Sequence, residues 1–269
     1  MRPLCLVLAL LCAPALVGAQ ADSTTRPPGA FTMVEVRRFG VTVVAGGIAY
    51  LGDQALRDAL QRPGVQSSEL LDGAARFGNA YGAPGVLVLG AAMWGGGLAA
   101  KRPVLATAGL RAIEAITVSG LVTQGLKVTA GRARPFTSPD NPADWKLFRA
   151  DDPVEGSYAS MASGHATAAF AFASAVTATV KRRAPERARA VGIITYGAAA
   201  VTAYARMHDD KHWLSDVTVG AGIGTVTGWA ITRWHDTRPD NPIDRVFLRP
   251  FVAPTRRGAT MVGVTFSTR

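Results

Sequence analysis

Three separated clusters of polar residues stand out in a chain that is otherwise rich in alanine, valine and glycine. Together they supply three cations, two imidazoles, a hydroxyl group beside a glycine, and a carboxylate. Cations can hold the oxygens of a phosphate group, and a histidine that is oriented by a carboxylate can attack its phosphorus. These residue types therefore predict phosphoryl-transfer chemistry. The clusters are Lys127 with Arg134, Ser163-Gly164-His165, and Arg206 with His212 and Asp216.

The third cluster carries the strongest chemical signal. His212 and Asp216 are four residues apart, so they would share a face if they open a helix. The carboxylate would then accept a hydrogen bond from one ring nitrogen and leave the other free to attack. A surface His/Asp pair is the alternative interpretation of this spacing alone. We also considered a metal site that includes His208 and its two neighbouring aspartates, but no second group has ligand spacing, so we predict none.

The first two clusters have ordinary structural interpretations when each is taken alone. Lys127 and Arg134 would be favourable near a helix C-terminus whatever their function. Ser163 is a suitable helix N-cap, while Gly164 would let the anion-binding start of that helix approach a phosphate closely. His165 is harder to explain as a cap, and it could protonate a leaving oxygen.

The elements that must position these residues are predicted to be helices. The apolar segments are long and rich in alanine and glycine, and they lack the strict alternation of strands. Residues 53–77 are predicted to form one or two amphipathic helices. The predicted fold class is all-α, an antiparallel bundle of about six core helices with the active site at one end. The apolar segments are 38–51, 83–100, 104–127, 163–180, 188–205 and 213–233.

Antiparallel alternation of the later helices would gather the three clusters. Lys127 ends one predicted helix, Ser163 to His165 start the next, Arg206 ends the third, and His212 starts the last. In an up-down bundle these four ends lie on the same side. The basic turns at 101–103 and 181–189 would lie at the opposite end.

The remaining segments define the predicted organisation of the chain. Residues 1–21 have a basic start, a short apolar stretch and small residues, as in a cleaved signal peptide, and they hold both cysteines, Cys5 and Cys12. Residues 22–34 are expected to be a flexible lead-in and 35–235 a single domain. Residues 236–269 form a proline-containing tail, with one strand expected at 259–266.

The long polar loop at 135–160 is predicted to border the active site. Its position in the chain, between the first and second clusters, is the basis for that prediction. The loop would contribute to substrate selectivity through its large apolar side chains. These are Phe136, Trp145 and Phe148.

The net charge of +10 does not indicate a nucleic-acid partner, because the basic residues are dispersed and no aromatic stacking platform accompanies them. A basic exported protein is expected to meet anionic lipid or phosphorylated substrates. Mean hydropathy is +0.17, and several apolar segments barely reach the roughly 20 residues of a membrane span.

If the helices cross a membrane, the basic turns belong in the cytoplasm and the active site faces the periplasm. A cleaved leader combined with a spanning 38–51 helix would invert that orientation. Either the 38–51 helix does not cross the membrane, or the leader is not cleaved, or the protein is a soluble periplasmic bundle. A membrane-associated protein with its site on the periplasmic side is favoured, and the soluble bundle is the alternative.

Taken in order, the motifs resemble those of the type 2 phosphatidic acid phosphatase superfamily, which includes bacterial acid phosphatases, lipid phosphate phosphatases and vanadium haloperoxidases. The resemblance covers about residues 83–233. Two positions depart from the usual pattern: Ala162 stands where the family has proline, and Ala205 where it has serine. Neither change removes a catalytic side chain. The matching pattern is Lys127-x6-Arg134-Pro135, Ser163-Gly164-His165 and Arg206-x5-His212-x3-Asp216.

The resemblance implies a role for each residue. His212 would form a phosphohistidine, Asp216 would orient it, and His165 would protonate the leaving alcohol and then activate water. The phosphate oxygens would be bound without a metal or other cofactor. The residues with that binding role would be Lys127, Arg134, Ser163, Gly164 and Arg206.

The expected substrate is a lipid phosphate, such as phosphatidate, an isoprenyl diphosphate or a phosphorylated lipid A. A small phosphoester is also considered, as in a soluble periplasmic non-specific acid phosphatase. A vanadate-dependent haloperoxidase is the second enzymatic hypothesis, and a lipid-binding scaffold without turnover is the non-enzymatic one.

Overall fold

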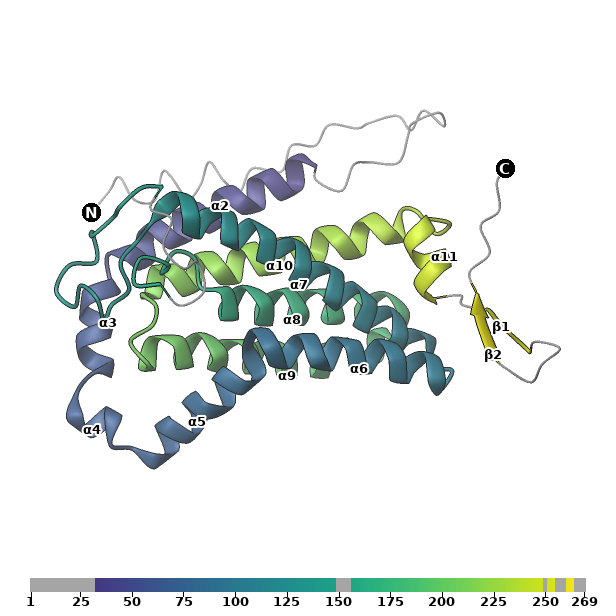
Figure 1. Ribbon diagram of the computed structural model, residues 1–269, viewed down its shortest axis with the longest axis horizontal. Helices are drawn as coiled ribbons and strands as arrows, with labels where there is room; N and C mark the ends of the chain where they lie inside the picture. Colours follow the sequence, from purple (N-terminus) through teal and green to yellow (C-terminus); the bar gives the residue numbers. More distant parts are fainter. Residues whose placement is uncertain (1–31, 149–155, 249–250, 255–259, 264–269) are drawn as a thin grey trace.

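The computed structural model describes residues 32–148, 156–248, 251–254 and 260–263. The predicted signal peptide, with both cysteines, and most of the lead-in lie outside these residues. Within them the chain forms an antiparallel helical bundle, as predicted (Figure 1). Its six long helices are α2 (Met33–Tyr50), α6 (Val86–Ala99), α7 (Pro103–Ala130), α8 (Gly164–Arg183), α9 (Pro185–His208) and α10 (Leu214–Asp236).

Helix α8 is the centre of the bundle and packs against α7, α9 and α10. Its interface with α10 is close because glycines face it. A methyl group at Gly224 would lie 2.7 Å from the Ala171 nitrogen, and one at Gly228 would lie 2.7 Å from the Ser174 Cβ. Real Cβ atoms do not approach this closely, so the glycines allow the two backbones to meet.

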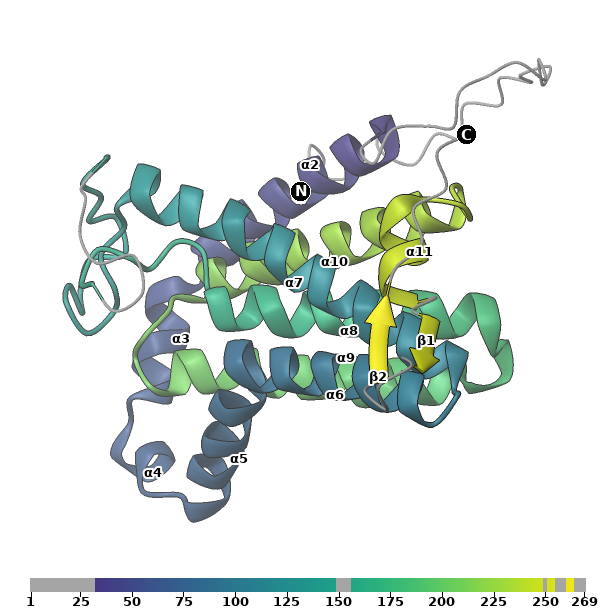
Figure 2. The same cartoon turned by 45° about the vertical axis from the view of Figure 1, so that its right-hand side comes forward.

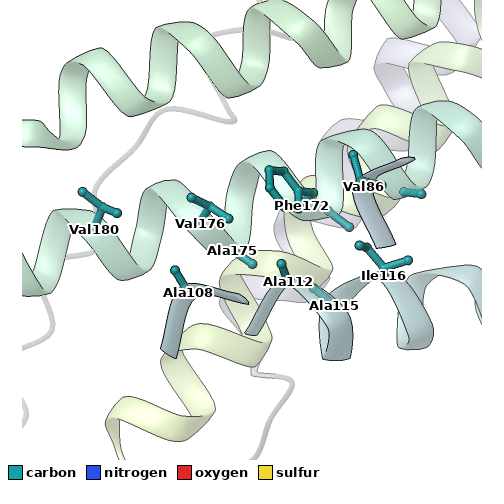
Figure 3. Close-up of a cluster of buried hydrophobic side chains, with 11 residues drawn as sticks. Val86, Ala108, Ala112, Ala115, Ile116, Phe172, Ala175, Val176 and Val180 are labelled. Carbon is teal, nitrogen blue, oxygen red and sulfur yellow. The ribbon is translucent and has the colours of Figure 1, made fainter. Parts of the chain in front are cut away.

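The other face of α8 packs its apolar side chains against α6 and α7 (Figure 3). Phe172 and Val176 of α8 meet Val86 of α6 and the alanine-rich face of α7 around Ala112. Small residues on α7 let these helices pack closely. This rigid core fixes the relative positions of the helix ends.

The predicted helices agree with the observed ones to within a few residues, and local sequence signals explain the boundaries. Pro103 and Pro185 occupy the first turns of α7 and α9, where a missing N–H costs nothing. Helix α7 ends before Gly131, which adopts φ 54°. Helix α2 starts at Met33, earlier than expected, because Thr32 and Glu35 form a capping box.

The segment between α2 and α6 contains three short helices rather than one or two. These are α3 (Asp53–Leu60), α4 (Pro63–Gln66) and α5 (Glu69–Ala80). Pro63 and the N-cap Ser68 each start a new helix, which interrupts the amphipathic pattern. A π-helical turn at Tyr81–Gly85 then joins α5 to α6, and α5 leaves α6 at an angle (Figure 2) while it packs against α9.

The C-terminal tail has more regular structure than predicted. Helix α11 (Pro242–Leu248) follows α10, and two strands follow it, β1 (Phe251–Pro254) and β2 (Thr260–Gly263). The strands pair antiparallel, with Phe251 opposite Gly263. The prediction of one strand at 259–266 was thus incomplete, because a strand needs a partner for its backbone groups.

Among the residues that the structure describes, two helical stretches are long and apolar enough to cross a membrane, Glu69–Ala99 and Pro103–Ala130. The α2–α3 pair, which is bent by 60°, makes up to three if it counts as one broken span. These stretches indicate a membrane-associated protein. The basic turns before α7 and between α8 and α9 lie at the end of the bundle opposite the polar clusters, as expected from alternation.

Candidate active site

The three polar clusters meet where α7 and α9 end and α8 and α10 begin. The backbone N–H of Ser163 donates to the Asp216 carbonyl at 3.1 Å, which joins the second cluster to the third. The Lys127 Nζ lies 3.9 Å from the point where a Cβ of Gly164 would be, which joins the first cluster to the second. The bundle therefore brings together residues that are almost 90 positions apart, from Lys127 to Asp216.

His212 is buried, and its tautomer follows from one hydrogen bond. Its Nδ1 lies 2.8 Å from the backbone carbonyl oxygen of Ser160, and a carbonyl can only accept. Nδ1 therefore carries the proton and Nε2 carries the lone pair. Burial lowers the pKa of His212 to about 3, against the opposing effect of Asp216 and with a further lowering from Arg206 and Arg134. A neutral imidazole with a free Nε2 is the nucleophilic form.

The structure corrects the expected geometry of His212 and Asp216. Helix α10 begins at Leu214, so His212 lies in the preceding turn and not on the helix. The closest Asp216 oxygen is 3.9 Å from His212 Nδ1, farther away than the Ser160 carbonyl. Asp216 instead accepts from the Ser160 hydroxyl and from the Trp213 backbone N–H at 2.9 Å. Asp216 therefore acts on His212 mainly through Ser160, whose carbonyl binds the imidazole, and through Trp213, which follows His212 in the chain.

A buried ionic network holds Asp216 in turn, and the sequence did not indicate it. Arg132 donates to Asp216 at 2.7 Å and to Asp53 of α3 at 2.6 Å. Ser215 bridges the same groups, accepting from Arg132 and donating to Asp53 at 2.7 Å each. The side chains of Arg132, Asp53 and Asp216 are fully buried. A basic residue near a helix end is common, so nothing in the local pattern marked Arg132.

His165 in the first turn of α8 is surrounded by the predicted cations. Burial lowers its pKa to about 4, and the charges of Arg206, Lys127 and Arg134 lower it further, in that order. The imidazole is therefore neutral near pH 7. A bound phosphate would offset the three positive charges and raise the pKa of His165 toward the range in which it can donate a proton.

The three cations reach the site from different elements. Lys127 is buried on the last turns of α7, whereas Arg134 lies beyond the helix, because Gly131 ends it. The Arg134 Nε donates to the Gly156 carbonyl at 3.0 Å, and Arg206 at the end of α9 donates to Asn79 at 2.7 Å. Cations of independent origin can surround a phosphate from several sides.

Ser163 is the N-cap of α8, as the sequence predicted for this residue taken alone. Its hydroxyl oxygen accepts from the Ala166 N–H at 3.4 Å. The hydroxyl proton remains a donor, and the free N–H groups of the helix start lie at Gly164 and beside it. Ala162, at the position that departs from the family pattern, is fully buried.

The loop between α7 and α8 lies next to this site in its described part. The indole of Trp145 lies over the Arg132 guanidinium, 4.9 Å from the ring centroid, and the Phe136 ring lies 4.8 Å from the Lys211 ammonium. Lys211 immediately precedes His212. Two of the three large apolar residues thus contact the elements that hold the site, whereas Phe148 is 74% exposed.

The two aspartates considered for a metal site have other partners. Asp210 accepts a two-point hydrogen bond from Arg57 at 2.8 and 2.9 Å, and Asp209 accepts from Asn79 at 2.7 Å. Among the residues that the structure describes, no group of three or more His, Cys, Asp or Glu side chains is arranged to hold a metal ion.

Comparisons with known proteins identify the family and the fold. The family model of the PAP2 superfamily matches residues 108–240, a range that contains all three clusters. A solved structure of a transmembrane PAP2 type phosphatidylglycerolphosphate phosphatase from Bacillus subtilis has the same fold, with a TM-score of 0.54 and 18% identity. The match covers 77% of this chain and 98% of that one. No curated protein matches the sequence. The chain belongs to the PAP2 superfamily, and this membership supports phosphatase activity.

Proposed function

We propose that this phosphatase hydrolyses a lipid phosphate, as a monoester or a diphosphate, through a phosphohistidine at His212 and without a metal ion. The observation that carries the proposal is the state of His212. It is buried and neutral, and its Nδ1 proton is held by the Ser160 carbonyl. Its nucleophilic nitrogen is therefore available at the end of the bundle where three cations converge.

In the first step, His212 Nε2 attacks phosphorus and the bond from phosphorus to the leaving oxygen breaks. His165, protonated once the phosphate neutralises the surrounding charges, donates its proton to the leaving alcohol. Lys127, Arg134 and Arg206 hold the nonbridging oxygens, whose charge grows in the transition state. Ser163 and the Gly164 N–H add two further donors.

In the second step, water attacks the phosphohistidine. His165, now neutral, takes a proton from this water, and the bond between phosphorus and His212 Nε2 breaks. Inorganic phosphate leaves, and the neutral imidazole of His212 is restored. Three fixed cations supply the charge stabilisation for which many phosphoryl-transfer enzymes use Mg²⁺.

Two observations support a lipid substrate. Two helical stretches in the described part of the chain are apolar enough to cross a membrane, and the similar solved structure is that of a transmembrane phosphatidylglycerolphosphate phosphatase. The basic turns at Lys101–Arg102 and Lys181–Arg183 favour the cytoplasmic side. We therefore propose that the active site faces the periplasm.

The test is phosphate release by the purified protein from phosphatidate, an isoprenyl diphosphate, a phosphorylated lipid A and soluble phosphoesters, with and without EDTA. We expect EDTA-resistant release, greatest with one lipid class, and inhibition by vanadate. His212→Gln should lose roughly 10⁴-fold or more in kcat and form no labelled phosphoenzyme. His235→Gln, which changes a buried imidazole at the other end of the bundle, is the matched control.

Three results would contradict the proposal. They are phosphate release that His212→Gln does not change, activity that EDTA abolishes, and oxidation of halide by the vanadate-loaded protein.

A further inference from the structure

The segment Gly78–Gly82, with the sequence Gly-Asn-Ala-Tyr-Gly, contacts the active site although it precedes the family match at 108–240. It covers the last turn of α5 and the start of the π-helical turn. Three of its five residues meet catalytic or phosphate-binding elements. None of the three sequence clusters includes it.

Gly78 lets α5 approach the end of α9. A methyl group at this position would lie 2.8 Å from the Ala205 Cβ and 3.0 Å from the Thr202 Cα. The Thr202 hydroxyl donates to the Gly78 carbonyl at 3.0 Å. The close contact therefore joins the segment to α9 directly before Arg206.

Asn79 binds both Arg206 and Asp209. Its Oδ1 accepts from an Arg206 Nη at 2.7 Å, and its Nδ2 donates to Asp209 at 2.7 Å. The orientation of the amide is unambiguous, since a guanidinium only donates and a carboxylate only accepts. Asn79 therefore holds one edge of the Arg206 guanidinium in a defined direction.

A second donor of Arg206 is left for a ligand. Its Nε is buried and has no hydrogen-bond partner among the residues that the structure describes. A buried donor without an acceptor is unfavourable, and an oxyanion beside it would remove that cost. The bond to Asn79 and the open Nε together suit an arginine that is preset for a phosphate oxygen.

Gly82 provides the space for the His165 ring. A methyl group on Gly82 would overlap the imidazole, with its Cγ only 3.0 Å away. A larger residue would therefore force the ring of His165 away from its present position.

We propose that Gly78–Gly82 is a fourth element of the active site, in which Asn79 is a positioning residue for Arg206 and Gly82 sets the position of His165. The inference rests on the proposed phosphatase mechanism. Because Asn79 acts through Arg206, its loss should weaken the binding of the phosphoryl oxygens. Because Gly82 acts through His165, its substitution should affect proton transfer to the leaving group.

The first experiment measures kcat/KM and the inhibition constant of vanadate for Asn79→Ala. We expect both to worsen by about 10- to 100-fold, as a misplacement of about 1 Å can produce. Asn241→Ala is the matched control, because that buried asparagine also binds a carboxylate, Asp244, at the opposite end of the bundle. If Asn79→Ala does not fold, Asn79→Gln carries the test, since it keeps the amide and moves it by one methylene.

The decisive comparison is the pair of variants Arg206→Ala and Arg206→Ala/Asn79→Ala. If Asn79 acts through Arg206, the double variant is no slower than Arg206→Ala. Losses that multiply would overturn the positioning role. Equal activity of Asn79→Ala and Asn241→Ala would overturn it as well.

The second experiment compares Gly82→Ala with Gly73→Ala on an alkyl and an aryl phosphate. A methyl group on Gly73 meets no atom within 4 Å, so it controls for the helix effect. We expect Gly82→Ala to slow the alkyl ester more, because its leaving group depends more on protonation by His165. Equal effects on both esters would refute the role of Gly82. A wild-type protein that neither releases phosphate nor binds vanadate would refute the proposed function itself.

Discussion

Replacing Arg132 by methionine would leave two buried carboxylates without their shared cation. Arg132 is the only side chain that binds Asp53 and Asp216 at once within the described part of the chain, at 2.6 and 2.7 Å. Burial alone would raise the pKa of Asp216, but the nearby His212 imidazole, the charge of Arg132 and the hydrogen bond from the Ser160 hydroxyl keep it below its ordinary value. Without Arg132, two negative charges would share a buried site.

Breaking a buried ion pair by removing one partner costs about 3–5 kcal/mol of the free energy of unfolding. We expect Arg132→Met to lie at the upper end of this range, because two carboxylates lose their partner. Arg76→Met is the matched control. Arg76 also pairs with an aspartate, Asp72, but its side chain is 73% exposed, and such pairs contribute about 0–1 kcal/mol.

The assay is denaturant unfolding of the detergent-solubilised protein, followed by tryptophan fluorescence. Asp53→Asn completes a double-mutant cycle with Arg132→Met, and we expect a coupling energy of about 1–3 kcal/mol. The activity of Arg132→Met should also fall, because Asp216 accepts from the Ser160 hydroxyl and from the Trp213 N–H, and both residues fix the position of His212. If Arg132→Met is no less stable than Arg76→Met, the ion pairs of Arg132 with Asp53 and Asp216 do not stabilise this end of the bundle.

Three further predictions follow from the same geometry. His165→Ala should slow hydrolysis of an alkyl phosphate by roughly 10²–10⁴-fold. With an aryl phosphate, this variant should accumulate the phosphohistidine, which acid-quench labelling would detect. Absence of that intermediate would contradict the role of His165 in activating water. The pKa values of His212 and His165 in the folded protein are about 3 and about 4, below the ordinary value of 6.5. Between the folded and the ordinary pKa, the unfolded chain binds more protons than the folded protein, so the free energy of unfolding falls as the pH drops below 6.5. For His212 the slope is about 1.4 kcal/mol per pH unit, and thermal unfolding of His212→Gln should show a weaker pH dependence between pH 7 and 5. Phe136→Ala should change the ratio of lipid to soluble substrate turnover while leaving vanadate inhibition unchanged, and Phe247→Ala, at the other end, controls for loss of an exposed aromatic ring.

Much of the fold could be predicted because its signals are local. Prolines at 103 and 185, the glycine at 131 and the cap at Ser163 delimit helices by backbone geometry alone. Alternating direction then brought the helix ends to one side, and the antiparallel bundle confirms that reasoning. The errors were local as well: the tail has two strands where one was predicted, and α10 starts two residues after His212.

The partners of the catalytic groups could not be predicted in the same way. Four-residue spacing suggested a direct bond between His212 and Asp216, yet the imidazole binds the Ser160 carbonyl, 52 residues away in sequence. A backbone carbonyl has no signature in a sequence. Its position depends on how the loop before α8 crosses the start of α10.

The sequence by itself determined which reactive side chains are present and at which end of the bundle they lie, because helix length and helix termini depend on neighbouring residues. Only the tertiary structure decided which nitrogen of His212 is free, which carboxylates Arg132 joins, and which side chain orients Arg206. Asp53 and Arg132 are separated by 79 positions in the sequence, and Asn79 and Arg206 are separated by 127. These contacts depend on close packing between helices, which no local pattern of residue types encodes.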